Sequence, residues 1–368
     1  MRANSGADAG NPRPPVRRPR FPSRAAFAGA AAILSLLAGS GHAQAGAAPA
    51  SVEDVRMLPY IEPGQRVDVG GRRINFTCMG DATHRPTVIL MGGLFSWSLV
   101  WYKTQAVIAA HARVCAFDRA SYGFSDPAGR PQIVDDVVED LHKALAAASL
   151  PRPYVLVGHS LGGLEARVYA GRWPEEVGGL VLIDTSPAAE GLIDENQPGF
   201  DDAEGRESYA SDMMHCAAQV RQGTLVPYSP EFRDCTATVP ADTPAVVRAF
   251  WPKFFTPDYF EAKVSLLTSL YTHRYDSADH LKLGALPLIV LSIEHPWETK
   301  SPASERLDPT YGPIWNEMHA DLARLSTRGV HRVIKDSGHH IQLDQPQAAI
   351  DAVEEVVREV RATTPART

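Results

Sequence analysis

The ten residues from Tyr154 to Gly163, YVLVGHSLGG, constrain the fold of this chain more than any other segment. A β-branched apolar run ends there in the pattern Gly-x-Ser-x-Gly around Ser160, and residues 164–170 have a helix-like composition. In this context the pattern predicts a sharp turn from a strand into a helix. The small flanking residues let the backbone pass closely. The turn would hold Ser160 in strained dihedral angles and place its hydroxyl at a helix N-terminus.

Three further segments end an apolar run in a short polar or glycine-rich motif. PTVILM (86–91) runs into GGLFSW, RVCAF (113–117) into DRASYGFSD, and VIK (333–335) into DSGHHIQLDQP. With the Ser160 motif between the second and the third, this order resembles the α/β-hydrolase superfamily over residues 56–361, and most of all its secreted bacterial members. The resemblance implies a mostly parallel α/β-hydrolase sheet with helices on both faces.

Hydrophobic periodicity indicates the same architecture. Residues 72–78 alternate as an antiparallel strand does, and residues 100–111 predict a helix. Residues 133–145 place their apolar side chains on one helical face, and Pro346 begins a terminal amphipathic helix. Buried strands are predicted at 179–183 and 286–291. Alternation of strands and helices favours a mostly parallel sheet covered on both faces.

Residues 186–284 interrupt this alternation with a long, helix-leaning stretch rich in aromatic side chains. The resemblance implies a helical cap here, inserted after the strand that ends near Asp184 and lying over Ser160. Residues 46–185 and 285–368 then form the α/β-hydrolase core. We expect most of the aromatic side chains to pack the cap on itself, and the remainder to line an apolar pocket.

Residues 1–45 differ in composition from the rest of the chain. They contain six arginines against one aspartate, then a short apolar stretch and the small-x-small site Ala43-Gln44-Ala45. This is typical of a secretory signal peptide, removed after about Ala45, and the apolar stretch is too short to span a membrane. We therefore expect a periplasmic or secreted protein without a stable membrane anchor. An amphipathic anchor that is retained is the alternative, and Arg17-Arg18 leaves a twin-arginine route open beside the general secretory one.

Charge and motifs exclude several classes of function. The chain has 36 basic and 43 acidic residues, and without residues 1–45 its net charge is about −12, with no basic cluster. Nucleic acid is therefore not an expected partner. The sequence has no phosphate-binding glycine loop and no cluster of His, Cys and Asp at metal-ligand spacing, so we expect neither a cofactor nor a metal.

Ser160 needs a general base, since its proton must leave before its hydroxyl can attack a carbonyl. The resemblance assigns this role to His339, in the Ser-Gly-His register, with His340 beside it as the rival. It also assigns the oxyanion hole to the backbone N–H groups of Leu94 and Leu161. Here Gly92-Gly93 replaces the commoner His-Gly pair, and the backbone donor does not need that histidine.

We expect Asp118, Arg119 and Gly123 to stabilise a tight turn near the pocket rather than to take part in the chemistry.

The carboxylate that completes the triad stays open between two positions. The usual place in the family follows the strand at 288–291, where this chain has Glu294 and, beyond Pro296, Glu298. Some members instead carry the acid after the preceding strand, where Asp184 stands. An aspartate there can hold the histidine tautomer and stabilise the imidazolium. We favour Asp184, with Glu294 as the alternative.

Four cysteines in an exported chain suggest two disulfides, for which three pairings are possible. Cys78 and Cys115 lie on strands that are neighbours in the resembled fold, and Cys216 and Cys235 both lie in the predicted cap. We expect the pairs Cys78–Cys115 and Cys216–Cys235, against the alternative of four free thiols.

These features predict a secreted serine hydrolase that cleaves a carboxylic ester bearing an apolar group through an acyl-enzyme. An amidase, a C–C hydrolase or an acyltransferase would use the same triad. A binding protein of the same fold without catalytic activity is the alternative from another class.

Overall fold

The structure is a computed structural model, and it describes residues 56–185, 203–236, 243–273, 275, 281–294 and 311–363. The predicted signal peptide, the point of cleavage and Glu298 lie outside the described residues.

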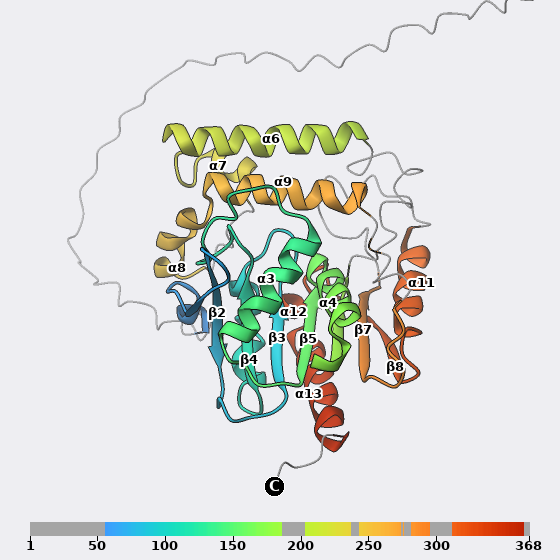
Figure 1. The fold of residues 1–368 in the computed structure, drawn as a ribbon. Helices are drawn as coiled ribbons and strands as arrows, with labels where there is room; N and C mark the ends of the chain where they lie inside the picture. The colour runs from blue at the N-terminus through green and yellow to red at the C-terminus, as the bar shows by residue number, and fades with distance from the viewer. Residues whose placement is uncertain are drawn as a thin grey trace, which may run out of the picture. The chain divides into compact units, whose positions relative to one another are not determined.

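The described residues form an eight-stranded sheet in the order β1-β2-β4-β3-β5-β6-β7-β8 (Figure 1). The pairs β1–β2 and β2–β4 are antiparallel, and every other pair is parallel. The mostly parallel sheet and its antiparallel early strand confirm the predicted fold class. The strands are β1 (Gln65–Asp68), β2 (Arg73–Met79), β3 (Thr87–Met91), β4 (Arg113–Asp118), β5 (Tyr154–His159), β6 (Val177–Ile183), β7 (Leu288–Ile293) and β8 (Gly329–Ile334).

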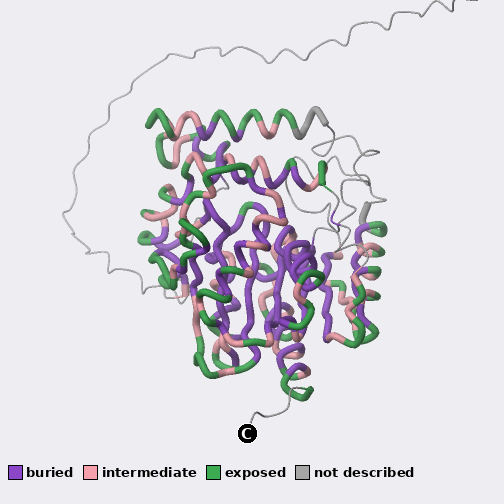
Figure 2. The backbone as a smooth tube through the Cα atoms, in the orientation of Figure 1, coloured by how far each residue is buried: buried purple, intermediate pink, exposed green. Residues whose placement is uncertain are grey.

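Helices cover both faces of the sheet. On one face, α3 (Val134–Ala147) and α4 (Leu161–Arg172) share a hydrophobic cluster with Leu156, and on the other α13 (Pro346–Thr363) packs with Val155 and Val157. Successive side chains of a strand point to opposite faces, which is why the run of β5 is apolar throughout. Figure 2 shows the central strands buried along their length. The smaller elements of the core are η1 (Leu58–Tyr60), η2 (Ser98–Trp101), α2 (Gln105–Ile108), η3 (Pro174–Glu176), α11 (Tyr311–Ala323) and α12 (Ile341–Asp344).

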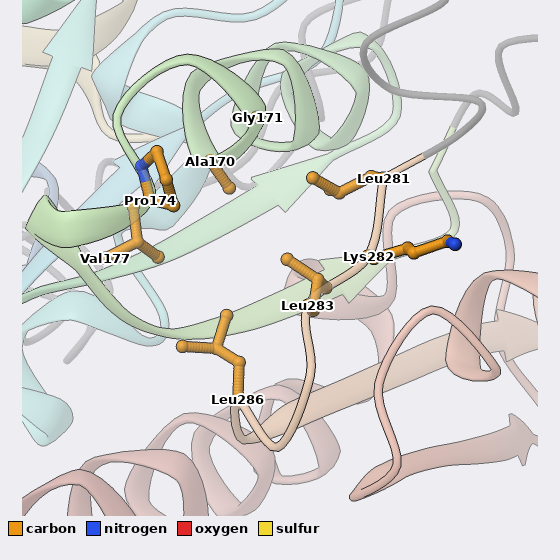
Figure 3. A pocket seen from close by; sticks show the side chains of 8 residues that line it. All are labelled: Ala170, Gly171, Pro174, Val177, Leu281, Lys282, Leu283 and Leu286. Atoms are coloured by element: carbon orange, nitrogen blue, oxygen red, sulfur yellow. The ribbon is translucent and has the colours of Figure 1, made fainter.

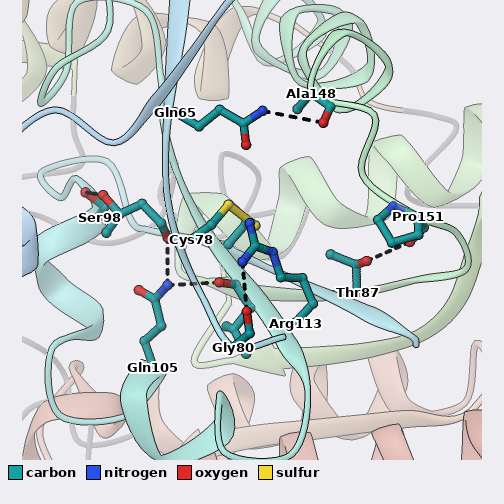
Figure 4. The surroundings of a disulfide bond; sticks show 12 residues. Gln65, Cys78, Gly80, Thr87, Ser98, Gln105, Arg113, Ala148 and Pro151 are labelled. Carbon is teal, nitrogen blue, oxygen red and sulfur yellow. Dashed lines mark hydrogen bonds between the residues drawn. A yellow bond between two sulfur atoms is a disulfide. The ribbon is translucent and has the colours of Figure 1, made fainter. Parts of the chain in front are cut away.

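The continuous helix predicted over residues 100–111 is wrong. The chain forms the 3-10 helix η2 and the short helix α2 instead. Gln105 is buried, and its Nε2 donates to the carbonyls of Thr77 and Val114 at 2.7 and 3.1 Å (Figure 4). Tyr60 donates to Oε1 of the same side chain. These bonds tie the segment to the edges of β2 and β4, a tertiary constraint that local periodicity does not contain.

Both disulfides of the structure have the pairing expected from the sequence. Cys78 and Cys115 face each other in the β2–β4 register and are bonded, as Figure 4 shows. Cys216 in α6 (Ala203–Gln222) is bonded to Cys235 in α7 (Pro230–Cys235). The described part of the chain has no free cysteine.

Between β6 and β7 the chain forms helices α6, α7, α8 (Ala245–Phe250), η5 (Trp251–Phe254) and α9 (Pro257–Thr272), which we call the cap helices. The helix α9 packs against α6 on one side and against α3 of the core on the other (Figure 1). Thr256 begins α9 by accepting a hydrogen bond from the Tyr259 amide, an N-cap that satisfies one of the free helix donors. Along the chain, the cap helices come after β6, which ends at Ile183, just before Asp184.

No described helix has both the length and the hydropathy that crossing a membrane requires.

Candidate active site

Ser160 occupies the turn between β5 and α4 with φ of 52° and ψ of −123°, in the strained region that the sequence predicts. The turn is possible because its flanks are glycines. A Cβ at Gly158 would lie 2.3 Å from the Gly162 carbonyl oxygen, and a Cβ at Gly162 would lie 2.3 Å from that of Met91. The Ser160 amide donates to the Ile183 carbonyl at 3.0 Å. The serine is therefore fixed by backbone contacts and is partly exposed at the N-terminus of α4.

His339 lies beyond the end of β8, and its Nδ1 is 2.6 Å from Oδ2 of Asp184, which follows β6. The other carboxylate oxygen accepts from Trp315 Nε1 at 2.9 Å and from the Ile293 amide at 3.3 Å. Burial alone would raise the pKa of Asp184, but the hydrogen bond and charge of His339, with His319 and Trp315, hold the pKa below its usual range. Asp184 is an ionised, fully enclosed partner for the histidine.

Glu294, the alternative acid, ends up in a different setting. Its amide donates to the Ile334 carbonyl at the end of β8, and its carboxylate lies 4.0 Å from Lys335 Nζ on a partly exposed surface. The carboxylate that contacts His339 Nδ1 is that of Asp184.

His340, the rival base, lines a cavity instead of contacting the acid. Burial, with the neighbouring His339, lowers the pKa of His340 to about 4, so this ring is neutral at physiological pH.

His159, within the elbow motif, has a positioning contact that the sequence did not reveal. It is buried, and its Nε2 lies 2.9 Å from the His339 carbonyl. A carbonyl can only accept, so Nε2 carries the proton. Burial lowers the pKa of His159 well below its usual value, which keeps the ring neutral. His159 therefore links the turn at Ser160 to the loop that carries His339.

The loop after β3 is held by its carbonyl groups. Arg119 donates from Nη1 to the Gly93 carbonyl at 3.0 Å and from Nη2 to the Gly92 carbonyl at 2.5 Å. The Tyr122 hydroxyl donates to the Leu94 carbonyl at 2.9 Å. Because these carbonyl oxygens are engaged, the orientation of each peptide in this loop is fixed. That is what a preorganised backbone donor at Leu94 requires.

Arg119 is in turn held by Glu165 of α4, an ion pair that is buried on both sides. Its Nε and Nη2 donate to the two carboxylate oxygens at 2.6 and 2.7 Å, a bidentate geometry. The sequence indicated Arg119 only as part of a turn and did not indicate Glu165. The sequence does contain a signal for Glu165, because it is a charged residue among apolar and small residues in a helix expected to be buried.

Asp118 has the structural role predicted for it. It accepts from Asn75 Nδ2 and from the Ser98 amide, both at 2.8 Å. Gly123, with φ of 52°, leaves room for it, because a Cβ there would lie 2.3 Å from its carboxylate.

An apolar cavity of about 540 Å³ lies between the cap helices and the core. Phe95 and Ser96, which follow Leu94, form one part of its wall, and His340 forms another. The cavity thus approaches the site through the residues next to Leu94 and His339. Four aromatic residues of the cap line it, namely Tyr209, Trp251, Phe255 and Tyr259.

A second hollow of about 360 Å³ lies at the C-terminal end of α4, away from Ser160 (Figure 3). Its walls are Ala170, Pro174 and Val177 on one side and residues 281–286 on the other. Lys282 is its one charged side chain, and Figure 3 shows that side chain pointing away from Pro174. No candidate catalytic residue lines this hollow.

Among the described residues, no group of three or more His, Cys, Asp or Glu side chains is placed to hold a metal ion.

Comparison with known proteins agrees with the fold. Residues 86–213 match a family model described as alpha/beta hydrolase fold. A putative lipase from Acinetobacter baumannii has 18% sequence identity and a TM-score of 0.61, and the alignment covers 87% of this chain and 100% of that one. The family match over residues 86–213 and the architecture together give this chain the α/β-hydrolase fold.

Curated relatives are similar over shorter stretches. An uncharacterised protein of Schizosaccharomyces pombe is 32% identical over 150 residues, covering 33% of this chain and 28% of the relative. The pimeloyl-[acyl-carrier protein] methyl ester esterase of Shewanella woodyi is 39% identical over 88 residues, covering 24% and 32%. The chain thus spans about a third of the length of these two relatives.

Proposed function

We propose that this protein is an exported serine hydrolase that cleaves carboxylic esters through an acyl-enzyme. Ser160 is the nucleophile, His339 the general base and Asp184 the acid of the triad. The observation that carries the proposal is the 2.6 Å contact between Asp184 Oδ2 and His339 Nδ1, with Asp184 buried. Supporting it, Ser160 stands in a strained turn at a helix N-terminus. The similarity to a lipase structure and to a methyl ester esterase agrees with the same chemistry.

In the first half-reaction, Ser160 Oγ attacks the ester carbonyl while His339 accepts its proton on Nε2. Nδ1 of His339 keeps its proton throughout and donates a hydrogen bond to Asp184. The carboxylate stabilises the imidazolium that forms. His339 then protonates the departing alcohol. In the second half-reaction His339 takes a proton from the water that attacks the acyl-enzyme, and it returns that proton to Ser160 Oγ as the carboxylic acid leaves.

The negative charge that develops on the carbonyl oxygen needs two fixed donors. We assign these to the backbone N–H groups of Leu94 and Leu161. The Leu94 peptide is held through its neighbours by Arg119 and Tyr122. The Leu161 amide is the first of α4, where the helix dipole favours negative charge.

The substrate we propose is a small ester with an apolar group, because the cavity beside the site is lined mainly by apolar and aromatic side chains. Export to the periplasm or the medium follows from the signal peptide expected at residues 1–45, and two disulfides suit an oxidising compartment. The core is assigned to residues 46–185 and 285–368 and the cap to residues 186–284.

The test is labelling with a fluorophosphonate probe, which reacts only with activated serines. We expect wild type to be labelled and Ser160→Ala to be silent. Ser149→Ala is the matched control, because Ser149 is another serine at positive φ (53°), exposed and remote from the site, and it should label like wild type. A folded wild type that takes no label and cleaves no ester would favour the binding-protein alternative. Cleavage of anilides but not esters in the same assays would favour an amidase.

A further inference from the structure

Lys263 is a buried lysine in the wall of the apolar cavity. It lies on α9, its exposed fraction is 6%, and it lines the cavity together with Phe95, Tyr209 and Tyr259. Lysine is almost never fully buried unless it is paired.

The contacts of Nζ are weak or uncharged. It lies 3.2 Å from the Met213 thioether sulfur and 4.4 Å from the centroid of the Phe95 ring. The Tyr209 and Tyr259 rings are further away, at 5.3 and 5.6 Å. No carboxylate of the described residues lies within 4.0 Å of Nζ, whereas Arg119, another deeply buried cation, has a bidentate carboxylate. Among the residues that the structure describes, Lys263 has aromatic faces and a thioether around it and no anion in contact with Nζ.

This environment leaves the charge of Lys263 incompletely compensated. Burial lowers the pKa of Lys263 to about 7, because a cation loses its hydration in an apolar site. An anion that entered the cavity would restore that lost stabilisation and would draw a proton onto the amine. A neutral apolar ligand would do neither.

Lys263 is also placed beside the catalytic loop. Its nearest ring, Phe95, follows Leu94, the residue to which we assign an oxyanion donor. Tyr259, one turn before Lys263 on α9, packs its ring 5.0 Å from that of Tyr122, which bonds the Leu94 carbonyl. A ligand in the cavity can therefore contact Lys263 and the loop that binds the reacting carbonyl at once.

We propose that Lys263 is a specificity-determining residue that binds a carboxylate carried by the substrate, so that the substrates are esters with an apolar chain ending in a carboxylate. This inference rests on the proposed ester hydrolase function and narrows its substrate class. The apolar walls accept the chain, and the buried amino group recognises its far end.

The experiment compares matched pairs of esters that differ in the terminal carboxylate alone. One pair is 4-nitrophenyl hexanoate and the mono-4-nitrophenyl ester of adipic acid, and shorter and longer homologues vary the reach. A second pair, hexyl butyrate and the butyrate ester of 6-hydroxyhexanoic acid, puts the carboxylate on the alcohol side. Full-length mature protein is assayed at pH 6.5 as wild type and as Lys263→Met, which keeps the length of the side chain and removes its charge.

For at least one pair we expect Lys263→Met to lower kcat/KM for the carboxylated ester about 10- to 100-fold, the loss expected for a charge-assisted hydrogen bond. The loss should appear in KM, and kcat/KM for the neutral partner should stay the same or rise. Lys253→Met is the matched control, because Lys253 is an exposed lysine of the same cap that lies over the Phe250 ring. It should leave both esters unchanged.

Two results would overturn the proposal. One is an equal change for both members of every pair, which would make Lys263 a structural link between α6 and α9. The other is that wild type hydrolyses no carboxylated ester although it hydrolyses the neutral ones. If neither kind of ester is cleaved, the proposed function has failed, and calorimetric titration with adipate monoester tests Lys263 by itself. Ser160→Ala should then bind the ester at least tenfold more tightly than Ser160→Ala/Lys263→Met.

Discussion

Two parts of the molecule differ in how their buried charges are paired. One is the floor of the site, made of Asp184, His339, Arg119 and Glu165, and the other is the wall of the apolar cavity at Lys263. On the floor, the charged groups of the proposed mechanism are paired: Asp184 has His339 and Trp315, and Arg119 has Glu165 and two carbonyl oxygens. In the wall, Lys263 is as deeply enclosed but has a thioether and aromatic rings for neighbours.

This difference separates two tasks. A group that must keep one geometry through a reaction is held by partners of the protein itself, which fixes its charge and its orientation. A group that recognises a substrate has to leave its interaction available for that substrate. Under the proposed function, the chemistry depends on the floor and the selectivity on the wall.

The largest effect is expected for the triad acid. Asp184→Asn keeps the size of the side chain but removes the acceptor that holds the His339 tautomer, and kcat on a neutral ester should fall by about 10⁴-fold. Glu294→Gln is the matched control and should change kcat by less than about threefold, since its carboxylate lies by Lys335. Steady-state kinetics on 4-nitrophenyl hexanoate measures both. The reverse ranking in folded variants would assign the acid to Glu294.

The second effect concerns the pair Arg119–Glu165. Glu165→Gln leaves the buried Arg119 without its counter-charge, and the free energy of unfolding should drop by about 3 kcal/mol. Denaturant titration measures this change. Glu139→Gln, in an exposed pair with Lys143, should cost less than about 0.5 kcal/mol.

A double variant separates stability from catalysis at the same place. Arg119→Met/Glu165→Leu replaces the pair by apolar side chains and should recover much of the lost stability. Its kcat should stay well below that of wild type, because the guanidinium that holds the Gly92 and Gly93 carbonyls is gone. A double variant with both the stability and the kcat of wild type would show that the pair contributes to folding alone.

The sequence predicted the floor better than the wall, for a physical reason. The turn at Ser160 and the strands that end before Asp184 and Gly92 depend on local patterns, namely apolar runs that stop at a glycine or at a polar residue, and these appear in the structure where they were expected. Glu165 and Gln105 were missed because their partners lie 46 and 28 residues away, and no spacing along the chain records such contacts. Long-range hydrogen bonds of this kind decided where the predicted helix over residues 100–111 was interrupted.

For Lys263, in contrast, the sequence does contain a local signal. On α9 the buried positions Tyr259, Phe260, Leu266 and Leu267 define one helical face, and Lys263 falls on that face. A lysine there indicates either a long side chain reaching solvent or a buried cation. Only the contacts of Nζ distinguish these two cases.

The third expected effect is the loss of stability when the cap disulfide is removed. Cys216–Cys235 closes 19 residues between α6 and α7, and the double variant Cys216→Ala/Cys235→Ala should lose about 3 kcal/mol of stability by the loop-entropy argument. Because the link lies within the cap, we expect limited proteolysis to cut the cap first. Cys78→Ala/Cys115→Ala is the comparison, since that link joins β2 to β4, and it should not produce early cap cleavage. Identical proteolysis of both variants would mean that cap and core open together.

The smallest effect is in the pH dependence of substrate choice. Lys263 has a pKa lowered to about 7 by burial, so the free enzyme carries this charge below pH 7 and loses it above. The titratable groups that line the cavity with it are Tyr102, Tyr209, Tyr259, Asp234 and His340. Burial raises the pKa of Tyr209 and of Tyr259 and lowers that of His340 to about 4, so these three stay neutral from pH 6 to 9. Asp234 is exposed at the rim.

Because kcat/KM reports the ionisation of free enzyme, the preference for a carboxylated ester over its neutral partner should fall by about tenfold between pH 7 and 8.5. The ratio of the two kcat/KM values cancels the titration of His339, which both esters share. Lys263→Met should make the ratio independent of pH at its low value, and Lys253→Met should follow wild type. A wild-type ratio that does not change with pH across this range would show that Lys263 does not recognise the substrate carboxylate. The cavity wall would then have no role in selecting the substrate.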